Sequence, residues 1–392
     1  MSLLGDGRAR PNPLPSIGGE ELIHRLEARN LLGRGGAGFP LARKWQAVRE
    51  NGHGNAVVLA NGAEGEPLSR KDRTLMTQQP HQVIDGAILA ARAIGSDDII
   101  FYVGVEHGAA SAAVRRALSE RPEAAARRAR LVEAPRGYVS GEESAAVHFL
   151  NAGDARPTTT PPRPFERGVG GRPTLVQNVE SLAAAAAMAR GDDSGTALVT
   201  TSGVVHRGGV QEISLHATAG DVAAAAGGLT KDIRAVLLGG YFGSWAAVDD
   251  VWNLPIDPTS LKARGLTFGC GVVSFFPADA CGVEATSKIL TYLASQSARQ
   301  CGPCVFGLGA IGAACRRLAD RTPLADDLRR IARWSGQLAG RGACKHPDGS
   351  TGLLRTALEV FTEDFLAHQH RRCVVRAAVV RSSTLVPVGA VA

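Results

Sequence analysis

The first half of the sequence alternates short apolar runs with longer stretches of helical pattern, and this alternation restricts the fold most. Apolar runs of strand type occur at 56–60, 98–103 and 130–133, and helical patterns occur at 80–94 and 108–120. Strands that alternate with helices are typical of a layered α/β domain with a largely parallel sheet. We therefore expect an α/β fold for this half of the chain.

The rest of the N-terminal half fits the same domain. A helix is predicted at 19–31, before a glycine-rich stretch at 33–40. Residues 151–173 are rich in Pro, Arg, Thr and Gly, which indicates a long loop, and a helix is predicted at 175–190. We expect the first domain to span 1–195.

The C-terminal half has a different character. Short β-type runs with turns predict a small inserted unit at 196–245, and 246–281, with a strand-type run at 268–276, is predicted to return to the first domain. Four amphipathic helical patterns predict a bundle at 282–370. The tail, 371–392, carries no prediction of structure.

Composition excludes several protein classes. No run of 18 apolar residues occurs and the start lacks the apolar segment of a signal peptide, so a cytoplasmic protein is expected. Seven cysteines, partly in C-x-x-C spacing, favour metal or redox use over a disulfide framework. A net charge of +7 favours an acidic partner, but no basic cluster interleaved with aromatic residues predicts nucleic-acid binding.

The glycine-rich stretch is the first candidate binding motif. Gly33, Gly35 and Gly38 satisfy G-x-G-x-x-G, but a helix rather than a strand is predicted before them, which disfavours an ordinary Rossmann βαβ unit. No Gly-Lys-Ser/Thr follows, so the stretch is not a P-loop. Its glycines would allow backbone N–H groups to approach an anion, and Lys44 could add a charge. A plain glycine-rich turn is the alternative.

Two polar clusters follow predicted strands. Residues 61–67 follow the strand at 56–60, and residues 137–144 follow the strand at 130–133 and open a helix. Ligands bind at the carboxyl ends of strands in open α/β sheets, so both clusters are candidate cofactor contacts. The alternatives are a solvated turn for the first cluster and helix stabilisation by carboxylates for the second.

The last candidate site consists of cysteines. Cys301 and Cys304 form a C-x-x-C pair forty residues before Cys344, which is metal or iron–sulfur cluster spacing. A thiol–disulfide pair or inert buried cysteines are the alternatives. Cys315 lies on an apolar helix face and is expected in the core. The remaining cysteines lack metal-like spacing and are expected to be structural: Cys270, Cys281 and Cys373.

Taken together, these motifs resemble one family. The segments 33–45, 61–73, 141–145 and 171–183, with the cysteine region 301–344, occur in the order and near-identical spacing of the flavoprotein subunit of respiratory complex I and of related hydrogenase diaphorase subunits. The resemblance covers residues 20–368. It implies a Rossmann-like FMN-binding domain, an inserted β-grasp (soluble-ligand-binding) domain and a C-terminal four-helix iron–sulfur bundle.

The resemblance also implies site residues. Phe39, Glu66 and Glu143 match positions at the NADH site. A 4Fe–4S or incomplete cluster would be held by Cys301, Cys304 and Cys344. FMN would lie against the glycine loop, with contacts from these positions: Gly33, Arg34, Gly35, Gly36, Gly38, Lys44, Asn61, Glu64, Tyr138, Gly141, Glu142, Val176 and Asn178.

The sequence departs from the family at the flavin and nucleotide positions. Ala63 stands where the family has an acidic flavin contact. On the nucleotide side, Ala47 and Arg163 replace aromatic residues and Thr160 replaces a lysine. These departures affect NADH binding more than flavin binding.

One departure affects the cluster. Ala298 stands where the family has a further cysteine, so three matching thiolates remain. The local candidates for a fourth ligand are Ser297 and His346.

The implied activity is that of an NADH dehydrogenase (diaphorase). FMN would accept hydride from NADH, and single electrons would pass through the cluster to a ferredoxin-like or 2Fe–2S partner. The alternatives are a relay or structural subunit of a larger redox complex that does not oxidise NADH, and a scaffold without cofactors. Such a complex could dock to a membrane subunit, which would place the chain at the inner face of the membrane.

Overall fold

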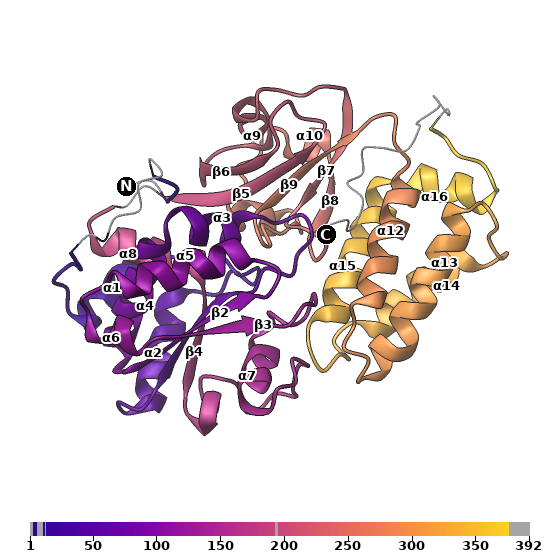
Figure 1. The fold of residues 1–392 in the computed structure, drawn as a ribbon. Coiled ribbons are helices and arrows are strands. Elements are labelled where there is room, and N and C mark those ends of the chain that lie inside the picture. Colours follow the sequence, from indigo (N-terminus) through magenta and orange to yellow (C-terminus); the bar gives the residue numbers. More distant parts are fainter. Residues whose placement is uncertain (1–2, 6–10, 12, 193–194, 376–392) are drawn as a thin grey trace. The chain divides into compact units, whose positions relative to one another are not determined.

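A four-stranded parallel sheet forms the centre of the first of two units into which the computed structural model divides (Figure 1). The structure describes residues 3–5, 11, 13–192 and 195–375. The first unit comprises the chain up to Gly65 with 69–199 and 212–214, and the second comprises 66–68, 200–211 and the chain from 215 onward.

The sheet of the first unit has the strand order β3-β2-β1-β4, and every neighbouring pair is parallel. Its strand interiors are almost wholly apolar because helices cover both faces of a parallel sheet. The three strands predicted from the sequence are confirmed. The strands are β1 (Val57–Gly62), β2 (Asp98–Gly104), β3 (Arg130–Ala134) and β4 (Thr174–Asn178).

The sequence prediction missed β4. A single helix was expected at 175–190, whereas the chain forms β4 and then α8 (Val179–Ala189). The side chain of Asn178 accepts hydrogen bonds from the backbone N–H groups of Glu180 and Ser181 and so caps α8 directly after the strand. Because strand and helix meet without an intervening turn, no Gly or Pro signal marks the boundary.

Helix α4 (Pro80–Ile94) packs against α8 and is buried along nearly all its length. A Cβ on Gly86 would lie 2.0 Å from the backbone oxygen of Leu182, so only glycine permits this approach. The other helices of the unit are α1 (Gly19–Ala28), α2 (Leu41–Gly52), α3 (Lys71–Gln78), α5 (Gly108–Ser119), α6 (Ala124–Arg128), α7 (Glu143–Ala152) and the 3₁₀ turn η1 (Val169–Gly171).

The second unit contains a mixed sheet with the order β6-β5-β9-β7-β8, in which β5 and β9 are parallel and β7 is antiparallel to β8 and β9. The boundary between the units falls within β5 and β6. The elements are β5 (Thr196–Gly203), β6 (Gly209–Ser214), α9 (Ala219–Ala225), β7 (Ile233–Leu238), β8 (Ser244–Ala247), α10 (Val248–Val251), α11 (Pro258–Ala263) and β9 (Val272–Pro277).

Strand β9 corrects one expectation. The segment 246–281 was expected to return to the first domain, but β9 lies at the centre of the second sheet, between β5 and β7. The run is apolar on both faces, which identifies a buried strand but not the sheet that it joins.

Helices follow β9 to the end of the described chain. The last of the four helical patterns, with Leu354, Leu358, Phe361 and Phe365 on one face, predicts a single helix, whereas the chain forms two: α15 ends at Val360 and α16 begins at Thr362. None of the helices in the described part has the length and apolar character needed to cross a membrane. The elements are α12 (Gly282–Ser295), the π-helical turn η2 (Pro303–Leu308), α13 (Gly309–Ala319), α14 (Asp327–Leu338), α15 (His346–Val360) and α16 (Thr362–Gln369). Residues 376–392 of the predicted tail lie outside the described residues.

Candidate functional site

The order of the first sheet defines where a ligand would bind. Strands β2 and β3 lie on one side of β1, and β4 lies on the other side. In open α/β sheets, ligands occupy the crevice at the carboxyl ends of the strands where the order reverses. Asn61 near the end of β1 and Asn178 at the end of β4 are register partners across this point. Two predicted site residues therefore meet at the switch point of the sheet.

The glycine loop lies against the same junction. It is closed by a hydrogen bond from the Gly33 N–H to the Phe39 oxygen, at 2.9 Å. The Arg34 N–H donates to Ser181 Oγ at 2.9 Å, and a Cβ on Gly35 would lie 3.3 Å from the Cβ of Asn178. The loop is thus fastened to the start of α8.

The other side of the glycine loop is open. Gly36 and Gly38 have φ values of +108° and +61°, in the left-handed region that favours glycine. A Cβ added at either residue would meet no atom within 4 Å. The side chain of Phe39 is 54% exposed. Open space beside a loop of this kind suits the approach of a phosphate to backbone N–H groups, so the loop fits a flavin phosphate.

Two further loops pack together at this edge of the sheet. The Asn61 side-chain amide donates to the Gly141 oxygen at 2.8 Å. A Cβ on Gly141 would lie 2.6 Å from the Ala63 oxygen, and a Cβ on Gly65 would lie 2.8 Å from the Tyr138 oxygen. The polar clusters predicted after the first and third strands are therefore in backbone contact.

A charged pair comes from two helices. Lys44 of α2 lies 2.7 Å from the carboxylate of Glu143, the first residue of α7, and both side chains are partly exposed. The preceding residue, Glu142, accepts hydrogen bonds from the N–H groups of Ser144 and Ala145. Glu142 is therefore a helix cap, whereas the Lys44–Glu143 pair is accessible to a ligand.

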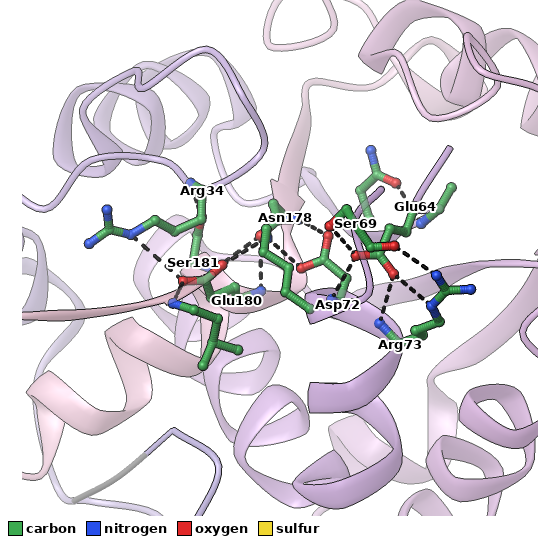
Figure 2. A network of polar contacts seen from close by, with 12 residues as sticks. Arg34, Glu64, Ser69, Asp72, Arg73, Asn178, Glu180 and Ser181 are labelled. Carbon is green, nitrogen blue, oxygen red and sulfur yellow. Dashed lines mark hydrogen bonds and ion pairs between the residues drawn. The ribbon is translucent and has the colours of Figure 1, made fainter. Parts of the chain in front are cut away.

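Beneath these loops lies a buried charge network (Figure 2). Lys71 Nζ is 2.7 Å from both Asp72 and Glu180, and Arg34 Nε is 3.9 Å from Glu180. Burial alone would lower the pKa of Lys71, but the two carboxylates outweigh it and raise that pKa above its ordinary value. Arg73 adds a contact of 3.5 Å to Glu64, so three cations balance three carboxylates.

The network occupies several side chains that were expected to contact flavin. The Glu64 carboxylate accepts hydrogen bonds from the Ser69 hydroxyl and from two backbone N–H groups at the start of α3. The amide of Asn178 donates to Asp72 at 2.8 Å while its oxygen caps α8. The Arg34 side chain pairs with Glu180, and Val176 packs in the core of the sheet.

Lys71 and Glu180 were missed as individual functional positions, although both stand within the recognised motifs. The available signal was Glu180 itself, a lone carboxylate that opens the alanine-rich run of α8. A carboxylate in such a stretch is rarely buried without a partner.

In the second unit, Cys304 interacts electrostatically with the other two predicted cluster cysteines, Cys301 and Cys344. The N–H groups of Cys304 and Val305 donate to the Cys301 oxygen and so begin η2. Burial, and then the neighbouring Cys301 and Cys344 sulfurs, raise the pKa of the Cys304 thiol to about 12. Three thiols that interact in this way fit an iron–sulfur cluster, whose positive irons would stabilise the thiolates.

Ser297 and His346, the candidates for a fourth ligand, differ in their surroundings. Ser297 Oγ is buried without a partner at hydrogen-bond geometry in the described chain, and its interaction with Cys304 opposes the rise in the pKa of that thiol. His346 Nε2 lies 2.8 Å from the Leu293 oxygen, to which it donates. Both side chains still offer an atom for iron, because the Leu293 contact engages only Nε2 of His346 and leaves Nδ1 as its possible ligand atom.

The structure also shows the surroundings of Cys315 and Glu66. Cys315 is fully buried in the core, as predicted, and burial raises its pKa to about 12. Glu66 belongs to the second unit, where its carboxylate accepts hydrogen bonds from the N–H groups of Leu68 and Tyr241. Its predicted nucleotide contact stays a prediction.

Two family models match the chain. Residues 26–187 match the Nuo51 FMN-binding domain, and residues 284–368 match the NADH-ubiquinone oxidoreductase-F iron–sulfur binding region. These matches confirm the expectation of FMN and iron–sulfur cofactors.

Similar proteins agree with these matches. One of the NADH-quinone oxidoreductase F subunits of Rhizobium meliloti is 30% identical over 94% of both chains. The F subunit of the Escherichia coli NADH-quinone oxidoreductase is 28% identical over 90% of this chain and 85% of its own. The crystal structure of a NAD⁺-reducing [NiFe]-hydrogenase superposes with a TM-score of 0.82 at 28% identity, covering 94% of this chain and 66% of the hydrogenase chain. This chain therefore belongs to the family of NADH-quinone oxidoreductase F subunits.

Proposed function

We propose that this chain accepts hydride from NADH on FMN and passes single electrons through an iron–sulfur cluster to a partner protein. The observation that carries the proposal is the meeting of the glycine loop, Asn61 and Asn178 at the switch point of a parallel sheet. FMN supplies the conversion from two-electron to one-electron transfer, and the protein supplies positioning and electrostatics.

The flavin contacts divide into backbone and side-chain groups. Gly36 and Gly38 offer backbone N–H groups on the open side of the loop, and Gly33 and Gly35 shape it. Lys44 supplies a positive charge. Six of the predicted side chains are engaged inside the protein, so these residues would contact flavin chiefly through backbone atoms: Arg34, Asn61, Glu64, Glu142, Val176 and Asn178.

The nicotinamide nucleotide would be held by the exposed Phe39 ring and by Glu143. Glu143→Gln keeps the shape of the side chain but removes the charge that faces Lys44. We expect this variant to retain FMN and to be reduced more slowly by NADH. Unchanged reduction by NADH would place the nucleotide site elsewhere.

The cluster would be held by Cys301, Cys304 and Cys344, with Ser297 as the fourth ligand. The support is the buried Ser297 hydroxyl that interacts with the Cys304 thiol. Ser297→Ala should lower the iron content or yield a three-iron cluster, and Ser297→Cys should yield four irons. Iron and sulfide analysis with low-temperature EPR distinguishes these outcomes. Four irons in Ser297→Ala together with loss in His346→Ala would assign the ligand to His346.

The sheet of the second unit is proposed to be the β-grasp domain of the family, extended to include β9. Two features support this assignment. The sheet is mixed and has five strands, and α9 lies between β6 and β7 along the chain. The helices from α12 to α16 would form the iron–sulfur bundle.

The partner is proposed to be an acidic ferredoxin-like or 2Fe–2S subunit of a larger redox complex. Val305 and Phe306 follow Cys304 directly and are 46% and 76% exposed. A net charge of +7 would steer an acidic partner toward the chain. Phe306→Ser should slow electron transfer to such a partner and leave reduction by NADH unchanged.

Anaerobic purification followed by reductive titration tests the whole proposal. The denatured protein should release a fluorescent flavin, and NADH should bleach the flavin absorbance of the native protein. A relay function, in which electrons enter from another protein, is favoured by Ala47, Thr160 and Arg163, which replace nucleotide-side residues of the family. Bleaching by dithionite but not by NADH would support the relay. Folded protein that neither carries nor binds FMN would refute both functions.

A further inference from the structure

A second group of metal-ligating side chains lies in the same unit, made of residues not assigned to the cluster. The ligand atoms of Cys281, His368 and Cys373 all lie within 4.8 Å of one another. Cys281 immediately precedes α12, His368 lies in the last turn of α16, and Cys373 follows that helix. Sequence spacing gave no sign of this group, because Cys281 and His368 are 87 residues apart.

The imidazole of His368 is oriented as in a metal site. Its Nδ1 atom lies 2.8 Å from the backbone oxygen of Leu318, which can only accept a hydrogen bond, so Nδ1 carries the proton. The lone pair of Nε2 is then directed toward Cys281 Sγ, 3.3 Å away. Metal-binding histidines commonly have this arrangement, in which a carbonyl fixes the tautomer from the far side of the ring. His368 is fully buried, which holds the ring in place.

The thiols are placed to become thiolates around a cation. Cys281 is the N-cap of α12 and so precedes the N–H groups of the helix's first turn, which have no partner within the helix. Helix N-termini stabilise thiolates.

We propose that Cys281, His368 and Cys373 bind one Zn²⁺ ion. Two thiolates and an imidazole are a ligand set that zinc accepts. Tetrahedral bonds of about 2.3 Å to sulfur and 2.0 to 2.1 Å to nitrogen place these atoms about 3.5 Å apart, close to the separation found between Cys281 and His368. Binding would release the two thiol protons.

The fourth position would be taken by water. The Asp364 carboxylate is engaged by Arg234 and by the N–H of Gly282. The chain after Val375 contains no Cys, His, Asp or Glu. No other such side chain of the described residues joins the three at the same spacing.

The ion would link the two ends of the helical segment. It would join the residue before α12 to the last turn of α16 and to the chain beyond it, and so restrain the helices that enclose the cluster cysteines. A cross-link between distant residues stabilises a fold chiefly by restricting the unfolded chain. Zinc has no redox chemistry, so the ion would not carry electrons.

The test is element-specific, so it does not depend on the flavin or on the cluster. Full-length protein, purified anaerobically after growth with zinc and iron, is analysed for both metals by mass spectrometry. We expect close to one zinc per chain in addition to iron. Zinc-edge X-ray absorption should show two sulfur ligands at about 2.3 Å and nitrogen or oxygen ligands at about 2.0 to 2.1 Å.

Variants separate this site from the cluster. Cys373→Ser should lose most of the zinc, keep the iron and melt at a lower temperature. Cys270→Ser is the matched control, because Cys270 is also half-buried but donates to the Gly239 oxygen away from the group. Cys301→Ser should lose iron and keep zinc.

Three results would overturn the proposal: zinc at background level in the wild-type protein, equal zinc in Cys373→Ser, or a disulfide between Cys281 and Cys373 in protein kept free of oxygen. Absorption data on the wild-type protein decide the question even where a variant fails to fold.

Discussion

Replacing Lys71 by methionine tests whether the buried charge network supports the first unit. Lys71 is 1% exposed and lies 2.7 Å from both Asp72 and Glu180. Methionine keeps most of the volume and apolar stem of the side chain but removes its charge. The remaining network would hold three carboxylates against two arginines.

The size of the effect follows from these distances. At an effective dielectric constant of about 20, each contact of 2.7 Å is worth about 6 kcal/mol of Coulomb energy. Most of this energy offsets the desolvation of the charges, and removal of one partner of a buried ion pair typically costs 3 to 5 kcal/mol. We expect Lys71→Met to lower the free energy of unfolding of the first unit by about 4 kcal/mol.

The assay must resolve the two units, because a chain of this kind need not unfold in one transition. Hydrogen exchange read by mass spectrometry reports the opening free energy of α3 and α8 separately. Lys231→Met is the matched control, since Lys231 pairs with Asp279 at 3.1 Å but both side chains are largely exposed. That control should cost about 0 to 1 kcal/mol.

A second substitution checks the mechanism. Glu180→Gln combined with Lys71→Met restores the balance of charge, so the double variant should be at least about 1 kcal/mol more stable than the sum of the single losses predicts. A loss below about 1 kcal/mol in Lys71→Met, or strict additivity in the double variant, would refute the argument that uncompensated charge is the cause.

Two further substitutions test the loop and the bundle. Gly36→Ala places a side chain at a φ of +108°, and the resulting strain of about 1 to 3 kcal/mol should weaken FMN binding about tenfold or more. A fluorescence titration measures this affinity. Gly54→Ala is the control, because it has a φ of +85° in another turn and should leave the affinity for FMN unchanged. Hydrogen bonds from Arg317 lower the pKa of the buried Asp327, so this carboxylate contributes stability above its unfolded pKa and loses it as pH falls through the folded value. Asp327→Asn should cost about 2 kcal/mol at neutral pH and should flatten the loss of stability as pH falls below the ordinary aspartate pKa of about 3.9. An unchanged acid profile in denaturant titrations would contradict this.

Local sequence patterns predicted an element correctly where the periodicity of its apolar side chains, or a turn at its end, determined that element. The strands at 57–62 and 98–104 and the helix at 80–94 were found because their apolar runs are bounded by turn residues. Strand β4 was missed because Asn178 ends the strand and caps the helix at once. The placement of β9 was wrong because pairing between strands depends on contacts far apart in the chain.

The site was located by its motifs, although many motif side chains do not face the open side of the loop. In the segment 178–181, Asn178 caps α8, Glu180 neutralises Lys71 and Arg34, and Ser181 accepts the Arg34 N–H. These side chains fix the position of the glycine loop, whose backbone is left open for an anion. A motif can therefore identify a binding site through residues that build the site without touching the ligand. For the same reason, a motif match alone cannot assign a contact to each of its residues, and the Cys281, His368 and Cys373 group has no sequence motif because its members meet only after the helices have packed.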